Sequence, residues 1–260
     1  MVDFVTEGYD AVYRAWNSPT FHAIWARTAV DGDIEPGLQH LNFATVGQLH
    51  RLAADLQLRP GERLLDVACG AGGPGLWVAR ATRAKLLGLD LSRVGTGIAA
   101  QRAKRLGIDA EFVAASVTMT GAIPGPVDGA MSIDSLQYVP DKQAAFAEIA
   151  RTLKPSGRMA FTAFELDAET VTGFPVLGED PVGDYRRVLE DVGLTVETYE
   201  QTPGWEERLT AAYSAVIDAE ALLRPEIGDA AMDSYLLEMS TTLALKPYKG
   251  RAYVVARKST

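Results

Sequence analysis

Three glycines between an apolar run and an amphipathic segment are the first residues that could do chemistry. Gly70, Gly72 and Gly75 satisfy the pattern G-x-G-x-x-G. Glycine permits a sharp turn and a close approach of a ligand, and the helix that follows presents unpaired N–H groups. Asp90 lies about 20 residues after the first glycine, where a carboxylate accepts hydrogen bonds from ribose hydroxyls. The set predicts a site for an adenosine-containing ligand.

A carboxylate ahead of this turn narrows the choice of ligand. Asp66 precedes Gly70 on the apolar run 63–68. A carboxylate beside a helix N-terminus would repel the pyrophosphate of a dinucleotide. It suits a positive amino group, such as the one at the methionine end of S-adenosylmethionine. The residues therefore favour S-adenosylmethionine over a nicotinamide dinucleotide.

At this point the sequence resembles the class I S-adenosylmethionine-dependent methyltransferases. LLDVACGAGG resembles their first motif and LLGLDLS resembles their second. The runs FVAAS, IDSLQYVPD and FAEIARTLKPSGRMAFT follow in the family's order. GGPGLWVAR is most similar to small-molecule methyltransferases of the ubiquinone/menaquinone, tocopherol and natural-product-tailoring type.

The resemblance implies cofactor contacts along these motifs, with the second motif's acid as the ribose ligand. The implied cofactor-binding residues are Asp66, Gly70, Ala71, Gly72, Leu76, Asp90, Leu91, Ser116, Val117 and Ile133. One of them departs from the family pattern. Ser116 stands where the family commonly has an acidic residue, and a hydroxyl accepts a hydrogen bond from the adenine amine less strongly than a carboxylate does.

Methyl transfer from a sulfonium depends mainly on alignment of the nucleophile, so a general base is optional. Ligands of a parallel sheet bind beyond the carboxyl ends of its strands, which places the loop 133–138 beside the reacting methyl group. We expect Asp134 to orient or deprotonate a substrate hydroxyl, with turn capping or a contact to the cofactor's amine as the alternative. Gln137 and Tyr138 stand where sugar-tailoring relatives often have histidines, and we expect them to contact substrate.

The three histidines all fall in the N-terminal segment. If that segment covers the pocket, His22 or His40 could be the base, and the alternative for each is a surface or packing role. No metal site is expected, because the Asp-Asn pair typical of the magnesium-dependent methyltransferases is missing. Cys69 is interpreted as a packing residue, since no histidine lies near it in the motif.

Short apolar runs alternate with helical patterns from about residue 61 onward, which is typical of βαβ units. The predicted fold is α/β: a Rossmann-like, seven-stranded, mostly parallel sheet with helices on both faces. We expect one domain over residues 1–260. It would comprise an N-terminal helical cap (residues 1–58), a cofactor-binding core (59–204), a helical lid (205–245) inserted between the last two strands, and the last strand (246–260).

The cap and the lid carry large apolar side chains that could face a substrate or pack onto the sheet. They are Trp16, Phe21, Trp25, Trp205, Tyr213, Met232, Tyr235 and Met239. Apolar and aromatic side chains usually line ligand pockets, so the substrate is expected to have an apolar or aromatic body. The lid is predicted as two helices.

Composition limits the partners. The chain has 260 residues, 25 Lys+Arg and 34 Asp+Glu, hence a formal charge of −9. This balance argues against nucleic-acid and anionic-membrane partners. A single cysteine excludes an internal disulfide, and no apolar stretch reaches the roughly 20 residues that cross a bilayer. We expect a cytoplasmic enzyme acting on a small molecule, and a homodimer is left open.

The leading hypothesis is methylation of a small, partly hydrophobic metabolite, at a hydroxyl in preference to nitrogen or carbon, in natural-product tailoring. Two alternatives stay open on the residues alone. One is a cyclase that binds S-adenosylmethionine on the same scaffold without methyl transfer. The other is an NAD(P)-dependent oxidoreductase that uses the same glycine pattern.

Overall fold

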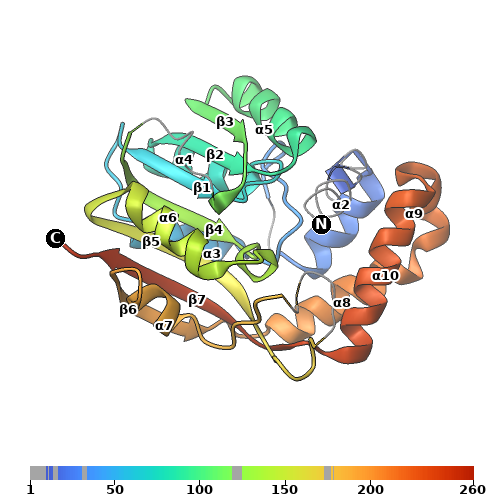
Figure 1. The fold of residues 1–260 in the computed structure, drawn as a ribbon. Coiled ribbons are helices and arrows are strands. Elements are labelled where there is room, and N and C mark those ends of the chain that lie inside the picture. Colours follow the sequence, from blue (N-terminus) through green and yellow to red (C-terminus); the bar gives the residue numbers. More distant parts are fainter. Residues whose placement is uncertain are drawn as a thin grey trace.

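A central sheet organises the part of the chain that the computed structural model describes, namely residues 10, 12–13, 17–30, 34–118, 125–172, 177 and 179–260 (Figure 1). The strands are β1 (Arg63–Val67), β2 (Lys85–Asp90), β3 (Ala110–Ala114), β4 (Val127–Ile133), β5 (Leu153–Leu166), β6 (Leu194–Gln201) and β7 (Tyr248–Lys258). Their order in the seven-stranded sheet is β3-β2-β1-β4-β5-β7-β6. Strand β7 runs antiparallel to β5 and β6, and the remaining pairs are parallel. The predicted fold class is confirmed.

The described helices fall into those that alternate with the strands and those that lie beyond them. They are α2 (Pro19–Thr28), α3 (Val46–Asp55), α4 (Gly73–Thr82), α5 (Arg93–Leu106), α6 (Lys142–Thr152), α7 (Arg186–Glu190), α8 (Trp205–Asp218), α9 (Glu220–Ile227) and α10 (Asp229–Leu245). The last three lie between β6 and β7, as predicted for the lid. Trp16 of the predicted cap lies outside the described residues.

Alternation of side chains along the strands builds a core on each face of the sheet. Leu65 packs with Phe146 and Leu189 of α6 and α7, whereas its neighbour Leu64 packs on the other face with Leu49 and Leu76 of α3 and α4. This is the two-sided burial expected of a mainly parallel sheet. Helices therefore cover both faces of the sheet, so a ligand must bind at the ends of the strands.

A third apolar cluster lies beyond the end of β5 and the start of β7. It brings α2 of the cap together with α8 and α10 of the lid, through residues such as Trp25, Tyr213 and Met232. Phe164 and Tyr248 contribute from the two strands. Figure 1 shows α2 beside α8, α9 and α10 at this end of the sheet. Helix α2 and the lid helices thus form one helical layer over the carboxyl end of β5.

Side-chain caps set the first residue of several helices. The Ser92 side chain accepts from Gly95 N at the start of α5, and that helix ends at Gly107 with φ of 65°. The Asp141 side chain accepts from Ala144 N at the start of α6. Such caps satisfy backbone groups that have no partner within the helix.

Three boundaries differ from the prediction, each for a physical reason. The lid contains three helices instead of two, because the chain breaks at Ala219 and again at Gly228, which has φ of 83°. Strands β5 and β7 extend beyond the apolar runs at residues 159–164 and 252–256, because the two strands pair from Arg158↔Arg257 to Leu166↔Tyr248. Backbone pairing with a neighbour continues a strand past its apolar residues.

Candidate active site

The glycine loop connects β1 to α4 and is held to the end of β2. Gly70 N donates to Asp90 Oδ2 at 2.8 Å, and Ser92 N donates to Asp90 Oδ1 at 2.8 Å. Ala68 takes the left-handed conformation, with φ of 55°, directly before the glycines. A left-handed φ in a residue other than glycine stores backbone strain, and such strain gathers at ligand-binding turns.

Glycine is required at the N-cap of α4. Gly72 has φ of 80°, and a Cβ at this position would lie 2.8 Å from the Cβ of Ala99 on α5. Gly72 N donates to Cys69 O at 2.8 Å, which closes the turn. The N-terminus of α4 is thereby packed directly against α5.

Asp66 points from β1 at the N-terminus of α4. The carboxylate is 2% exposed and accepts a hydrogen bond from the Gly75 backbone. Burial, with a smaller contribution from the Asp90 carboxylate, raises the pKa of Asp66 well above its usual range. In the described part of the chain no cation pairs with it. A buried carboxylate without a cation suits a ligand that brings a positive charge.

The carboxyl ends of β2 and β3 provide a second surface. Asp90 is paired in register with Ala114, and Ala115 N donates to Asp90 O at 2.9 Å. Leu91 next to it is an exposed large apolar residue, at 39% exposure. Ser116 Oγ lies 2.8 Å from Thr118 Oγ1, and Val117 is partly buried against the core. An apolar surface beside hydroxyls suits the flat face and polar edge of adenine.

Three predicted cofactor residues are more deeply placed. Leu76 is fully buried in α4, and Ile133, at the end of β4, is 6% exposed. Ala71 is buried, and its carbonyl accepts from Arg102. Their side chains are almost fully buried, so these residues give the site its shape. Polar contacts with a cofactor would come from neighbouring residues.

The sequence prediction missed Arg102, which joins the cap to the glycine loop. From α5 it donates to Ala71 O at 2.6 Å, Gly37 O at 2.7 Å and Gln39 O at 2.8 Å. Burial lowers the pKa of Arg102 to about 10, so it stays charged at neutral pH. Its only sequence signal is a basic residue on the apolar side of an amphipathic helix.

Tyr13 was also missed and lies over the glycine loop. Its ring approaches the α-carbons of Gly70 and Gly95 so closely that a Cβ at either glycine would contact it. Nearby, the Ser92 hydroxyl donates to Asp10. Tyr13 thus lies over the glycine loop, and Asp10 lies at the start of α5 beside it.

Asp134 is held by four donors inside the protein. Its Oδ1 accepts from Arg251 Nε and Thr162 Oγ1, both at 2.8 Å. Its Oδ2 accepts from Phe43 N at 2.8 Å and Arg251 Nη2 at 3.0 Å. This corrects the expectation of a carboxylate available to a substrate hydroxyl, because its lone pairs are already used. The four donors lie on three residues outside the turn after β4, so the carboxylate does not cap that turn but connects it to the cap, β5 and β7.

Arg251 extends this network to the cap and to the lid. It is fully buried, and its Nη1 donates to Gln48 Oε1 at 3.1 Å and Thr202 Oγ1 at 3.2 Å. Gln48 belongs to α3, and Thr202 lies just before α8. The Asp134–Arg251 pair therefore joins β4, β7, the cap and the entry to the lid.

The histidines differ in their surroundings. His40 is 4% exposed, and among the described residues only the Asn42 backbone comes near a ring nitrogen, without the geometry of a full hydrogen bond. Burial lowers the pKa of His40 to about 4, against smaller opposite effects of the Asn42 backbone and of Asp134. His22 is partly exposed on α2. A buried neutral imidazole beside the Asp134 network has nitrogens available for a ligand.

The two residues expected to contact substrate lie in the single turn Leu136–Tyr138 after β4. Gln137 is fully buried; its Nε2 donates to Asp134 O at 2.6 Å, and its Oε1 has no partner among the described residues. Tyr138 is partly exposed, and its Oη lies 3.5 Å from Glu238 Oε1 of α10. Glu238 is a polar residue of this region that the sequence prediction missed.

Comparison with known proteins decides the family. A family model described as "Methyltransferase domain" matches residues 64–157. The 27-O-demethylrifamycin SV methyltransferase of Amycolatopsis mediterranei (strain S699) is 30% identical over 224 residues, which cover 77% of this chain and 79% of the relative. The chain belongs to the S-adenosylmethionine-dependent methyltransferases. Its cofactor is accordingly S-adenosylmethionine, and the oxidoreductase alternative falls away.

Two solved structures have the same fold as this methyltransferase. The [4+2]-cyclase SpnF has a TM-score of 0.73 at 22% identity, over 98% of this chain and 95% of SpnF. The cyclopropane synthase MmaA2 from Mycobacterium tuberculosis has a TM-score of 0.74 at 16% identity, over 97% and 98% of the two chains. The match over almost the full length includes the helical layer.

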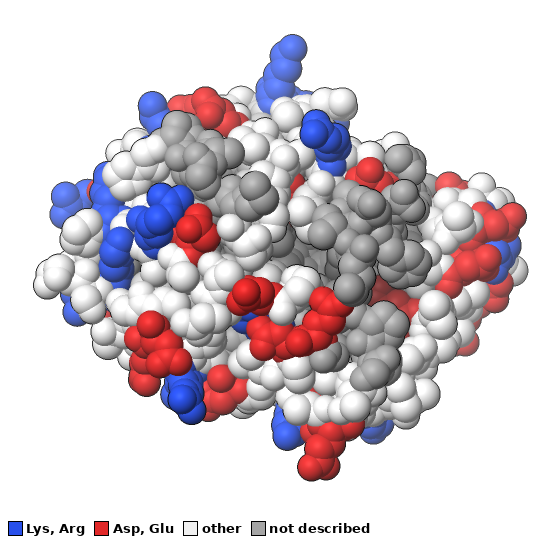
Figure 2. All heavy atoms as spheres, in the orientation of Figure 1, with Lys and Arg blue, Asp and Glu red and all other residues white. Residues whose placement is uncertain are grey.

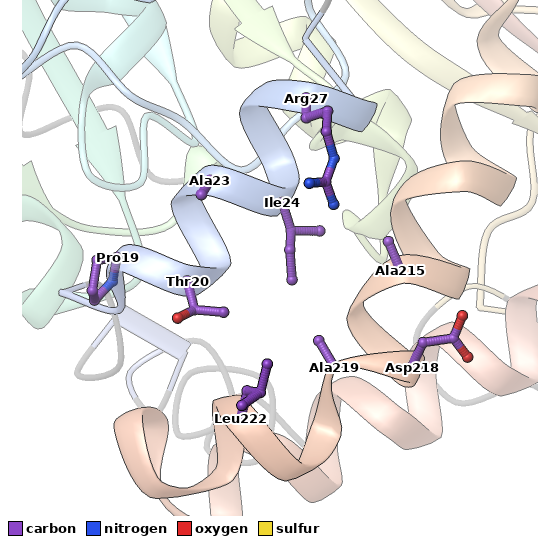
Figure 3. Close-up of a pocket in the computed structure, with 9 residues that line it drawn as sticks. All are labelled: Pro19, Thr20, Ala23, Ile24, Arg27, Ala215, Asp218, Ala219 and Leu222. Atoms are coloured by element: carbon purple, nitrogen blue, oxygen red, sulfur yellow. The ribbon is translucent and has the colours of Figure 1, made fainter.

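Two further surface features of the methyltransferase bear on its partners. A pocket of about 690 Å³ lies between α2 and the helices α8 and α9, with Ile24 and Leu222 in its wall and Arg27 and Asp218 among its polar residues (Figure 3). No predicted cofactor residue lines it. On the face shown in Figure 2, acidic and basic side chains are interspersed over the described residues. No described helix is long and apolar enough to span a membrane.

Proposed function

We propose that this methyltransferase methylates a hydroxyl of a small, partly hydrophobic metabolite in natural-product tailoring. The observation that carries the proposal is the similarity to the rifamycin enzyme, which extends over 77% of this chain. That relative's name places its methyl group on an oxygen of a natural product. The apolar cluster of the cap and lid supports a substrate with an apolar body.

The described residues fit S-adenosylmethionine at the carboxyl edge of the sheet. Asp66 would pair with its amino group, Asp90 with its ribose hydroxyls, and Leu91, Ser116 and Val117 with adenine. The turn from Gly70 to Gly72 would pass under the methionine part, with Ala71, Leu76 and Ile133 as its apolar surroundings. When bound, the cofactor supplies a methyl group activated on a sulfonium sulfur.

The protein's own contribution is alignment, water exclusion and proton removal. Asp134 and Arg251 fix the loop after β4, so that substrate groups near Gln137 and Tyr138 meet the cofactor at a set angle. His40 is proposed as the proton acceptor. A hydroxyl that takes a methyl group becomes strongly acidic, so even an imidazole with a pKa of about 4 can accept its proton. His22 is the less favoured candidate.

A transfer assay tests the proposal. The purified enzyme is incubated with methyl-labelled S-adenosylmethionine and a panel of hydroxylated aromatic and macrocyclic compounds that includes 27-O-demethylrifamycin SV. We expect at least one acceptor to gain the labelled methyl group by mass spectrometry. The His40→Gln variant should lower that rate without loss of cofactor binding. Products labelled on nitrogen or carbon alone would contradict the choice of hydroxyl.

The same assay tests the cyclase alternative, which stays open because the [4+2]-cyclase SpnF has the same fold. A cyclase yields a product with the mass of its substrate and no label. An isomeric product that forms with S-adenosylhomocysteine in place of S-adenosylmethionine would establish cyclisation and overturn methyl transfer.

A further inference from the structure

His40 lies in a stretch of the cap, residues 37–43 (the cap segment), that is attached to the rest of the protein on both sides of the histidine. After His40, Phe43 N donates to Asp134 Oδ2 at 2.8 Å. Before His40, Arg102 of α5 donates to the backbone of the cap segment. So short a segment leaves the backbone of His40 little freedom, and the two attachments set the position of its imidazole.

Arg102 joins the cap segment to the glycine loop through three backbone carbonyls. Its Nε donates to Gly37 O at 2.7 Å, and its Nη2 donates to Gln39 O at 2.8 Å. Its Nη1 donates to Ala71 O of the glycine loop at 2.6 Å. A planar guanidinium holds several acceptors in one fixed geometry, which a lysine ammonium on its flexible stem does not do. The two backbones are therefore fixed relative to each other by one side chain.

The start of α4 provides a second, independent contact between the same two backbones. A Cβ at Gly73 would lie 2.5 Å from Gln39 O and 2.8 Å from Leu38 O. The two carbonyls can approach so closely only because Gly73 has no side chain. The Leu38 side chain is fully buried, in the same cluster as Leu76 of α4. The cap segment thus lies directly on the helix start beside which the cofactor is proposed to bind.

The imidazole of His40 is placed by its backbone and not by bonds to its ring. The ring is 4% exposed and lies within electrostatic range of Arg102, Asp134 and Arg251. Among the described residues only the Asn42 backbone comes near a ring nitrogen, without the geometry of a full hydrogen bond. The attachments of the cap segment are therefore what orients the ring toward a ligand.

We propose that Arg102 is a positioning residue for methyl transfer, which fixes the cap segment on the glycine loop so that His40 meets the acceptor hydroxyl when the cofactor is bound. The inference rests on the proposed function, because it takes His40 as the proton acceptor. Arg102 acts through the backbone of the cap segment. A cofactor that orders the glycine loop orders the cap segment as well, through Ala71 O and the guanidinium.

Hydrogen exchange tests this connection without knowledge of the substrate. Exchange of the backbone amides in residues 37–43 is followed by mass spectrometry with and without S-adenosylhomocysteine. In the wild type, S-adenosylhomocysteine should slow exchange in the cap segment by about fivefold or more, and also in the glycine loop. In Arg102→Lys the slowing should persist in the glycine loop and fall below about twofold in the cap segment.

A matched variant separates a specific effect of Arg102 from general loosening of the cap. Arg80→Met removes the exposed ion pair with Glu35, just before the cap segment, and should keep the wild-type slowing. If Arg102→Lys fails to fold by circular dichroism, Gly73→Ala decides, because its Cβ pushes the same segment off α4. The inference is overturned by slowing of the cap segment that persists in the deciding variant, is absent from the wild type, or is lost equally in Arg80→Met.

A kinetic comparison tests the role of Arg102 in catalysis, with the hydroxyl compound that is methylated in the transfer assay. Arg102→Lys should lower kcat by about tenfold to a hundredfold, as expected for a misplaced proton acceptor. Its affinity for S-adenosylhomocysteine should stay within about threefold of the wild type. In the His40→Gln background the same substitution should have almost no further effect on kcat. Equal losses in the two backgrounds contradict an action through His40.

Failure of the proposed function gives different results from failure of the inference. A wild type that does not bind S-adenosylhomocysteine, or a His40→Gln variant with the kcat of the wild type, contradicts the proposed function, and the inference falls with it. Normal S-adenosylhomocysteine binding and a slow His40→Gln variant, together with cap-segment exchange that does not depend on Arg102, contradict the inference alone.

Discussion

At the scale of single residues, the site depends on groups whose pKa values burial has moved. Burial raises the pKa of Asp66 well above its usual range and raises that of Asp90 in the same direction. Burial lowers the pKa of His40 to about 4. Displaced pKa values of this kind gather at functional sites because a ligand's charge can compensate for desolvation.

The affinity for S-adenosylmethionine should fall on acidification. A raised pKa means that Asp66 takes up a proton at a higher pH than an ordinary carboxyl, and the protonated form cannot pair with an amine. Calorimetric titration from about pH 8 to about pH 5 should show affinity decreasing with pH. Asp66→Asn should weaken binding by about tenfold to a hundredfold and flatten this dependence. Asp109→Asn, at an exposed site, is the control.

His40 should make the protein less stable in acid. Its pKa is about 4 in the fold against 6.5 when unfolded, so the unfolded chain binds more protons between these values. Stability contributed by the neutral ring is therefore lost as pH falls from 6.5 toward 4, by up to about 3 kcal/mol. Urea titrations should show a smaller acid loss for His40→Gln. An equal loss in variant and wild type would refute a buried neutral His40.

At the scale of elements, the glycine loop and the Asp134–Arg251 pair have different origins. The loop is local: a strand, three glycines and a helix start occur within one short stretch, and Asp90 closes it from the next strand. The pair is not local, because Asp134 and Arg251 are 117 residues apart. The glycine loop and the Asp134–Arg251 pair both lie at the carboxyl ends of the strands, and separate variants test the contribution of each to stability.

Gly72→Ala should disrupt the loop for two reasons. The left-handed φ of 80° strains any side chain, and the new Cβ would meet Ala99 at 2.8 Å. We expect a loss of about 1–3 kcal/mol in the free energy of unfolding, with partial recovery in Gly72→Ala/Ala99→Gly. Gly97→Ala, on α5 with open space around it, should gain up to about 1 kcal/mol. Equal effects at the two glycines would contradict this account.

Breaking the buried pair should be costly. Arg251→Met leaves Asp134 as a buried carboxylate without its cation, and we expect a loss of about 3–5 kcal/mol in urea denaturation. Asp134→Asn should cost a comparable amount, and the double variant should cost less than the two together. Arg257→Met, whose partner Glu197 is at the surface, should stay within about 1 kcal/mol. Additive losses at Asp134 and Arg251 would argue against coupling.

At the scale of the whole molecule, the sequence predicted what short-range patterns control. The alternation of strands and helices, the glycine loop and the lid between the last two strands all follow from neighbouring residues. The short helix α9 was missed, because no glycine or proline marks the break at Ala219 that separates it from α8. The spacing of apolar residues does not show where the chain leaves one helix and begins the next.

The roles of single polar residues could not be predicted in this way. Asp134 looked free because its partners Phe43 and Arg251 are far along the chain. The contact between Glu238 and Tyr138 could not be predicted, because the two residues are 100 positions apart. Such contacts arise only when the sheet brings the cap, the loop after β4 and the lid to one end. The methyltransferase site is therefore a property of the assembled fold.

The position of the transferred methyl group tests the central claim most directly. The product formed with S-adenosyl[methyl-13C]methionine and an accepted substrate is examined by carbon–proton correlation NMR. The account predicts one labelled methyl signal at the chemical shift of an O-methyl group, with a correlation to the carbon that carried the hydroxyl. A labelled signal at an N-methyl or C-methyl shift, or an unlabelled isomer as the only product, would contradict it.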